Sequence, residues 1–240
     1  MSDSFALECV PGVSIVDVQP GVSKERLEQL QEMLLHWFPD HAHVADELAD
    51  AWEHGSFDPD ITVHQWLLLH DSSPRGLFIF HVNLRRGIVV RHFLAMDESV
   101  RGGLEPDWVR HLVAACEAQA LRDACAREVE ILALMSEIAP DQPRLLAHWA
   151  KLGHRAFPEI EYREPFHGKH WADHGQLRFF PMTANVYVTS AGARLPLSEV
   201  VEAAVSAFLL DHYRLPPDDP IVAGILTRAR ELSTEADQSN

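Results

Sequence analysis

The sequence predicts an α/β fold in which a mixed, mostly antiparallel central sheet is flanked by helices and followed by a helical C-terminal extension. Strand-like and helix-like segments alternate over residues 12 to 190 in the order β-α-α-β-β-β-α-β-α-β-β. Three of the strand-like runs follow one another with only short turn-forming segments between them, which is typical of antiparallel neighbours. After residue 190 only helical patterns occur. With 47% hydrophobic and 23% charged residues, the 240-residue chain has the balance of a globular protein with a sizeable core.

The first half of the chain combines helical apolar stripes with runs of β-branched and aromatic residues. Ser23 is placed to cap the first helix, and Phe38-Pro39 ends it. The segment from Asp71 to Gly76 has the composition of a turn. The predicted elements here are strands over 12–18, 63–70, 77–83 and 88–96 and helices over 23–36 and 44–52.

A long helix from Pro106 to about Ala126 carries the clearest apolar stripe. Proline suits its first position, as Gly153 suits the end of a later helix. The stripe recurs at i, i+3, i+4, i+7 and i+11 through Val109, Leu112, Val113, Cys116 and Ala120. The other predicted elements of this half are strands over 128–135, 156–163 and 177–189 and a helix over 143–152.

The chain beyond residue 190 predicts two helices separated by a proline-rich breaker at 216–220. Apolar residues gather on one face of the first helix, namely Val200, Val201, Ala204, Phe208 and Leu209. Such a face docks either on the rest of the protein or on a partner. We therefore divide the chain into a domain over 1–190 and a helical extension over 191–240, whose polar end is expected to fray.

Acidic residues outnumber basic ones by 36 to 20, which gives a formal net charge of -16 at pH 7. Such a surface repels phosphate backbones and anionic membranes, so neither nucleic acid nor a membrane is expected as a partner. It would favour a cationic small molecule or a basic protein. The other interpretation is that the acidity only maintains solubility.

No targeting or membrane-spanning segment is expected. No apolar run reaches the ~18 residues that cross a bilayer, and the N-terminal segment lacks the basic and apolar regions of a secretory signal. Cys9, Cys116 and Cys125 show no metal-ligand spacing and are odd in number. We expect a cytoplasmic protein with reduced thiols.

Two short segments resemble motifs of the GCN5-related N-acetyltransferase (GNAT) superfamily. The segment His148-Trp149-Ala150-Lys151-Leu152-Gly153-His154 is similar to the family's Y-x-K-L-G-F element. The segment Met96-Asp97-Glu98-Ser99-Val100-Arg101-Gly102 is similar to the lead into its R/Q-x-x-G-x-G/A loop. The order of predicted elements over 12–190 is also that of the family. The resemblance implies a GNAT-like acyl-CoA N-acyltransferase domain that uses acetyl-CoA as the acyl donor.

The resemblance places the donor at the end of strand 88–96 and in the loop that follows, where amides and a helix N-terminus hold a pyrophosphate. The residues that it implies for donor binding are Leu94, Ala95, Met96, Val100, Arg101, Gly102, Gly103 and Leu104. The chain then departs from the family pattern with Glu105-Pro106-Asp107-Trp108. Either the loop still binds CoA with Glu105 and Asp107 turned away, or the loop is degenerate and these carboxylates only stabilise the helix start.

The reaction that the resemblance implies is direct attack of an amine on the thioester, which needs a base for the amine proton. His92 and Glu137 are the candidates, and a hydrogen-bonded core histidine and a solvated glutamate are the alternatives. Many family members use the tyrosine of Y-x-K-L-G-F as the acid for the leaving thiolate. Trp149 stands there instead, and an indole N–H cannot serve. The acid is therefore water, another residue or absent.

The family places the acceptor amine near the early helices, which makes Trp37 and Trp52 candidate substrate-binding residues; packing in the core or rim is the other interpretation. The leading function is acyl transfer from acetyl-CoA to a small amine, cationic if the acidic surface acts on it, or to a protein amino group. The alternative is a GNAT-like domain that has lost catalysis and serves as a binding or assembly module. A homodimer formed through the 196–232 helices is possible.

Fifteen histidines raise the question of a metal. His167, His170 and His174 lie close together in sequence beside Asp173, and three imidazoles with a carboxylate could hold zinc. Glycines in this segment indicate a loop, and no H-E-x-x-H signature is present. No metal is therefore expected.

Overall fold

The computed structural model describes residues 4–56, 58–104, 107–165 and 178–232. Within these residues the chain forms two compact units: 4–82 with 92–119, and 83–91 with 120–165 and 178–232. Hydrogen bonds join eight strands in the order β1-β2-β3-β4-β5-β6-β10-β7, while β8 pairs with β9. Of the registers that we describe, only that between β5 and β6 is parallel. The predicted α/β class with a mixed, mostly antiparallel sheet is confirmed.

The strands of the first unit begin with one that was not predicted, β1. The bounds are β1 (Ser4–Ala6), β2 (Val13–Asp17), β3 (Ile61–His70), β4 (Ser73–Asn83) and, in its second half, β5 (Ile88–Met96). Between β3 and β4 the turn is shorter than predicted. Only Asp71 and Ser72 form it, with φ of 48° and 65°, the left-handed pair that suits a two-residue hairpin.

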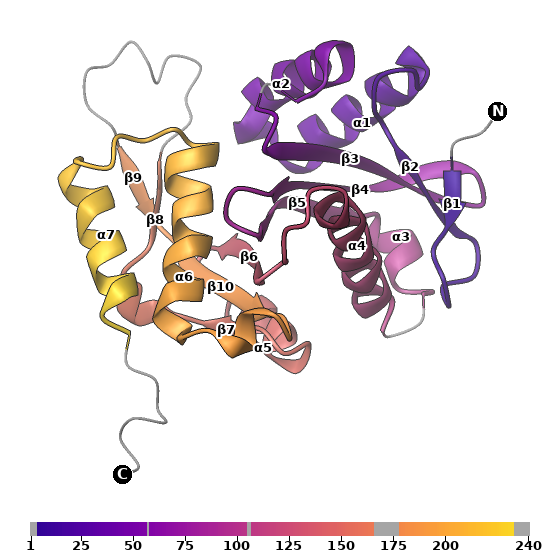
Figure 1. The fold of residues 1–240 in the computed structure, drawn as a ribbon. Helices are drawn as coiled ribbons and strands as arrows, with labels where there is room; N and C mark the ends of the chain where they lie inside the picture. Colours follow the sequence, from indigo (N-terminus) through magenta and orange to yellow (C-terminus); the bar gives the residue numbers. More distant parts are fainter. Residues whose placement is uncertain (1–3, 57, 105–106, 166–177, 233–240) are drawn as a thin grey trace. The chain divides into compact units, whose positions relative to one another are not determined.

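Helices cover both faces of the first unit's strands (Figure 1). They are α1 (Lys24–Trp37), η1 (Pro39–His41), α2 (Ala42–His54), α3 (Glu98–Arg101) and α4 (Trp108–Cys125). α1 and α2 bury their apolar sides against β2, β3 and β4, where Leu30, Leu34 and Leu67 have no exposed surface. Ser23 occupies the N-cap position of α1, but its side chain does not make the predicted capping hydrogen bond.

The strands of the second unit depart most from the prediction. The bounds are β6 (Ala133–Ile138), β7 (Arg155–Ala156), β8 (Arg163–Pro165), β9 (Phe179–Pro181) and β10 (Thr183–Val188), with α5 (Pro143–Lys151) and η2 (Pro158–Ile160). The strand predicted over 156–163 is wrong because Pro158 starts a short 3-10 turn after two strand residues. The strand predicted over 177–189 is divided at Met182, and Leu177 lies outside the described residues.

The strand predicted over 128–135 is also misplaced, since β6 begins at Ala133. Glu128 has a φ of 55°, and the Val129 N–H turns back to donate to the Ala124 oxygen at 3.0 Å. These residues therefore end α4. The residues up to Leu132 form a connection in which Ile131 is buried, and the Leu132 N–H donates to the Gly87 oxygen at 2.7 Å.

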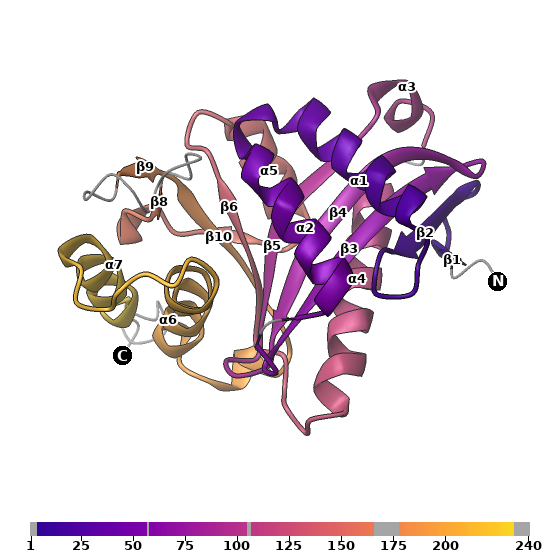
Figure 2. The same ribbon diagram turned by 90° about the horizontal axis from the view of Figure 1, so that it is seen from above.

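The C-terminal segment packs within the second unit. It contains η4 (Gly192–Arg194), α6 (Leu197–Ser206), a π-helical turn, η5 (Ala207–His212), and α7 (Pro220–Arg230). α6 and α7 lie side by side (Figures 1 and 2). The predicted apolar face is confirmed, because Val200, Phe208 and its other members have no exposed surface and pack against residues of β6 and β10. In the described part of the chain, no helix combines the length and the apolar character that a bilayer crossing demands.

Candidate functional site

The second half of β5, which belongs to the first unit, is partly accessible to solvent. The parallel ladder with β6 covers Ile88 to Arg91, and β5 continues beyond it through Met96. His92, Phe93, Leu94 and Ala95 are all partly exposed, which is unusual for consecutive residues of a strand between two neighbours. Leu94 and Ala95, predicted for donor binding, thus lie on an accessible part of the strand, whereas Met96 at its end is buried.

The loop after β5 folds into a single helical turn, α3, which the sequence did not predict. Asp97 caps it: one carboxylate oxygen accepts from the Ser99 N–H at 2.9 Å and from its hydroxyl at 2.7 Å. The N–H groups of Val100 and Arg101 donate to the Asp97 oxygen, and those of Gly102 and Gly103 donate to Glu98 and Val100. The amides from Ser99 to Gly103 therefore already have partners within the turn.

The charges around this turn are balanced. Arg75 lies 3.6 Å from Asp97, Arg101 lies 3.6 Å from Glu98, and Arg110 lies 3.9 Å from Asp107. Each of these three carboxylates thus has a guanidinium within 4 Å, which reduces the repulsion that an incoming anion would meet. Glu105, the remaining acidic residue of concern, lies outside the described residues.

The glycines of the turn are not required by its backbone. Gly102 has a φ of -69°, which any residue adopts. A Cβ there would lie 3.7 Å from the Glu98 oxygen, and one at Gly103 would lie 3.6 Å from the Val100 oxygen. A side chain can therefore be introduced at either position without a clash, and these glycines leave the approach to the backbone open.

A groove of about 470 Å³ opens beside the start of the turn in the first unit. It is lined by Glu32, Met33, His36, Trp37, Pro74, Arg75, Asp97 and Glu98. Trp37, one of the two candidate substrate-binding residues, is therefore part of its wall. The other, Trp52, is not among the lining residues: its indole N–H donates to the Val22 oxygen at 3.0 Å, and the ring packs on the core beneath α1 and α2.

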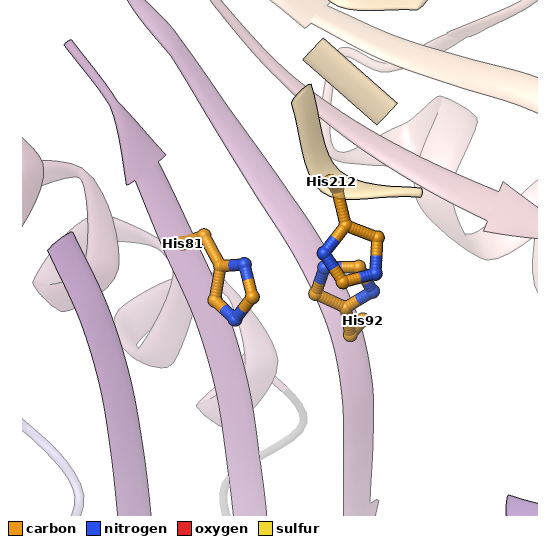
Figure 3. A group of neighbouring side chains, drawn as sticks. All are labelled: His81, His92 and His212. Carbon is orange, nitrogen blue, oxygen red and sulfur yellow. The ribbon is translucent and has the colours of Figure 1, made fainter. Parts of the chain in front are cut away.

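His92, one candidate base, stands next to a second histidine. Figure 3 shows His81 of β4 and His92 of β5, whose ring centroids are 4.7 Å apart; the figure also draws His212, which belongs to the second unit. Burial, with the nearby charge of His64, lowers the pKa of His81 to about 4. His81 is therefore neutral at physiological pH, and it can exchange a hydrogen bond with a neighbouring ring. Nothing in the sequence indicated this pair apart from histidines at matching places on two consecutive strands.

Trp149, at the position of the family's tyrosine, lies in the core of the second unit. The guanidinium of Arg91 is 4.5 Å from the centre of its ring, and Arg91 Nη2 is 3.3 Å from His154 Nδ1. Burial and the Arg91 charge lower the pKa of His154 to about 2. The indole therefore serves as a packing surface for a buried cation. A charged residue, Arg91, directly after the apolar run from Ile88 to Val90 was the sequence signal for this cluster.

Glu137, the other candidate base, is also in the second unit, where it is partly exposed and its carboxylate is held by hydrogen bonds. The hydroxyls of Tyr162 and Tyr213 both donate to its carboxylate. Burial, together with the neighbouring charge of Glu164, raises its pKa well above the usual range. The sequence did not identify Tyr162, Glu164 or Tyr213, because they come from segments far apart in the chain. His167, His170 and His174 lie outside the described residues.

Several solved structures have a fold similar to that of this chain. Two chimeras of the Vibrio cholerae spermidine N-acetyltransferase SpeG and hSSAT each match with a TM-score of 0.50 at 9% identity, over 77% of this chain and 99% of theirs. An acetyltransferase from Streptococcus agalactiae matches with a TM-score of 0.47 at 10% identity, over 75% of this chain and 99% of its own. No family model matches the chain, and a search of curated proteins gives no match. The predicted fold is thus confirmed: the chain has the GNAT fold.

Proposed function

We propose that this protein transfers an acetyl group from acetyl-CoA to a small amine. The observation that carries the proposal is the GNAT fold combined with the accessible end of β5 and the turn that follows it. A fold alone does not define an activity. Here, however, the residues that the resemblance implies for donor binding follow one another along the end of β5 and the turn after it, and all of them except Met96 are at least partly exposed.

The donor would lie along Leu94, Ala95 and Met96, with its pyrophosphate at the turn from Val100 to Leu104. Since the amides from Ser99 to Gly103 are engaged within α3, the anion would be held by the groups that follow them. Amides in the first turn of an α-helix have no partner within the helix and carry the positive end of its dipole, and α4 begins at Trp108. Arg101 and Arg110 offset the charges of Glu98 and Asp107, with which they pair.

The acceptor that fits the groove beside the turn is a cationic amine. Glu32 and Glu98 offer carboxylates to an ammonium group, and the Trp37 ring offers a face that attracts a cation. The acidic net charge of the whole chain acts in the same direction by concentrating cations at its surface. A polyamine is the small molecule that best combines these properties, and spermidine is the acceptor named for the two enzymes of similar fold.

In this reaction the amine nitrogen attacks the thioester carbon, the C–N bond forms and the C–S bond breaks. The proton lost by nitrogen goes to a base, and we propose His92 or Glu137, acting directly or through water. The thiolate leaves as such or takes a proton from water, because Trp149 is buried and its indole has no acidic proton. His92 is a plausible base because its partner His81 stays neutral.

The test is release of free CoA thiol when the protein is mixed with acetyl-CoA and amines of different charge. We expect a polyamine to give the highest kcat/KM, and Glu32→Gln to raise its KM by about twofold to fivefold, the loss of one exposed ion pair. Glu53→Gln, which changes an exposed residue of α2, is the matched control. Acetyl-CoA binding without thiol release for any amine would contradict the proposal.

A second function has specific support. The amides of the α3 turn are already paired, and the position of the family's acid is filled by a buried tryptophan. Both favour a GNAT-like domain that binds a partner without catalysis. This alternative predicts no affinity for acetyl-CoA, which a calorimetric titration with acetyl-CoA measures.

A further inference from the structure

Four polar side chains meet in the second unit although they come from distant parts of the chain. Glu137 lies on β6, Tyr162 just before β8, Glu164 on β8, and Tyr213 directly after η5 in the C-terminal extension. Tyr162 is 1% exposed and Tyr213 6%. Buried groups of this kind are costly unless they pair with one another, so their meeting requires an explanation.

The hydrogen bonds define an order within the cluster. The Tyr162 hydroxyl donates to Glu137 Oε1. The Tyr213 hydroxyl oxygen is 2.5 Å from Glu137 Oε2 and 3.4 Å from Glu164 Oε1. A phenol has a single proton to donate and lone pairs to accept with. Tyr213 can therefore donate to one carboxylate while it accepts from the other, once that other carboxyl is protonated.

The cluster favours the retention of a proton. The groups that face Glu137 are the two phenols and the carboxyl of Glu164, and the ring of His212 lies 4.6 Å from that of Tyr213. Burial and the neighbouring carboxyl raise the pKa of Glu137, and burial raises that of Glu164. Two carboxyls that bond to one phenol and are partly withdrawn from water do not both ionise readily, so they titrate as a pair.

We infer that Glu137, Tyr213 and Glu164 form a proton relay, in which Tyr213 passes a proton between the two carboxyls. This rests on the proposed function for its use. Within the second unit, Glu137 would pass a proton that it has taken up to the Tyr213 oxygen as the phenol's own proton moves to Glu164. One O–H bond forms for each that breaks, and the phenol is regenerated. Glu164 is partly exposed and can release the proton to water.

The relay would give the C-terminal extension a role in proton transfer within the second unit. Tyr213 follows η5, whose Asp211 accepts from the Asn83 side chain at 2.8 Å and pairs with Arg86. The segment just before the phenol is therefore fixed by these polar bonds and by the buried ring of Phe208. Tyr213 acts through Glu137 and is in this sense a positioning residue that does not touch the substrate. Tyr162 holds Glu137 in place and does not take part in the proton transfer.

The test is an infrared titration of the protonated carboxyl band, with Glu137→Gln and Glu164→Gln used to assign each group. In Glu164→Gln the like charge is gone, so we expect Glu137 to ionise at a pH lower by about one unit or more. Tyr213→Phe should shift the titrations of both carboxyls, while Tyr162→Phe, an equally conservative change, should shift that of Glu164 by much less, because Tyr162 is hydrogen-bonded to Glu137 and Tyr213 to both carboxyls. A Tyr213→Phe variant in which Glu164 titrates as in the native chain would overturn the relay.

Turnover provides a separate readout. If thiol release is found, Tyr213→Phe and Glu164→Gln should each move the rising limb of the kcat pH profile, and the double variant should be no worse than the stronger single one. Coupled titration without any turnover would retain the linked carboxyls and reject the acetyltransferase. Turnover with uncoupled titration would reject the relay alone.

Discussion

Single polar residues in the first unit show how buried charge is tolerated. Asp17, at the end of β2, accepts from the Gln65 N–H at 3.1 Å and from the Gln19 side chain at 3.0 Å. Its other oxygen is 2.6 Å from His64 Nδ1, and His64 stacks on Phe80 with ring centroids 4.7 Å apart. Burial opposes ionisation of Asp17, but the bonds and the charge of His64 outweigh it and lower the pKa of Asp17.

Replacement of Asp17 by Asn should therefore destabilise the protein by about 1–3 kcal/mol at pH 7, because a charge-assisted bond to a buried imidazole is lost. Asp71→Asn is the control, since that exposed carboxylate lies 3.5 Å from His70 and should change stability by under about 0.5 kcal/mol. Because the folded-state pKa of Asp17 is depressed, its contribution is present above the model-peptide value of 3.8 and is lost as pH falls below it. Urea unfolding at pH 7 and pH 3 measures both effects, and equal losses in the two variants would refute this account.

At the scale of elements, the sequence was informative where an apolar pattern coincided with a stop signal. α1, α2 and α5 match their predicted extents closely, and Gly153 ends α5 with a φ of 88° as expected. β6 did not match its predicted extent, because the apolar residues Val129, Ile131 and Leu132 carry the alternating pattern of a strand although they lie in a connection. The short α3 was missed since four residues give no helical period. The Asp97 carboxylate caps that turn by accepting a hydrogen bond from the Ser99 N–H. Hydrophobic periodicity does not predict hydrogen bonds of this kind.

Replacement of each of two glycines by alanine should change the stability of the protein in opposite directions. Gly87, in the turn between β4 and β5, has a φ of 66°, and a Cβ there would lie 2.3 Å from the Glu130 oxygen. Gly87→Ala should therefore cost about 1–3 kcal/mol. Gly224 lies within α7 and has only the end of the Arg228 side chain nearby, at 3.6 Å, so Gly224→Ala should stabilise by about 0.5–1 kcal/mol. Urea midpoints that move in the same direction for both would contradict the argument.

For the whole molecule, the central question is what the C-terminal extension does. α6, η5 and α7 provide many of the buried residues that pack on β6 and β10 in the second unit. The sequence predicted their apolar face correctly but left open whether it met a partner. It could not predict the carboxyl and tyrosine cluster, because Glu137 and Tyr213 are 76 residues apart and neither belongs to a motif.

A chain that ends at residue 191 should fail to fold as a stable monomer, because the second unit would expose the apolar surface that these helices cover. A chain that ends at residue 232 is the control and should retain the native unfolding transition. Circular dichroism and light scattering distinguish the two cases. A folded, soluble monomer from the shorter chain, with a dimer from the full-length one, would show instead that the extension is an interface.

The central claim, that the turn after β5 holds the pyrophosphate of acetyl-CoA, is tested most directly by calorimetric titration with acetyl-CoA and with free CoA. Gly102→Glu places a carboxylate at the turn where a Cβ has room. Ala118→Glu adds the same charge at an exposed position of α4, about 15 Å along the helix from its first residue, Trp108. We predict micromolar binding by the native chain and by Ala118→Glu, and loss of binding by at least about tenfold in Gly102→Glu. Absence of heat with either ligand at millimolar concentration, or equal binding by all three proteins, would contradict the claim and make the non-catalytic module the better account.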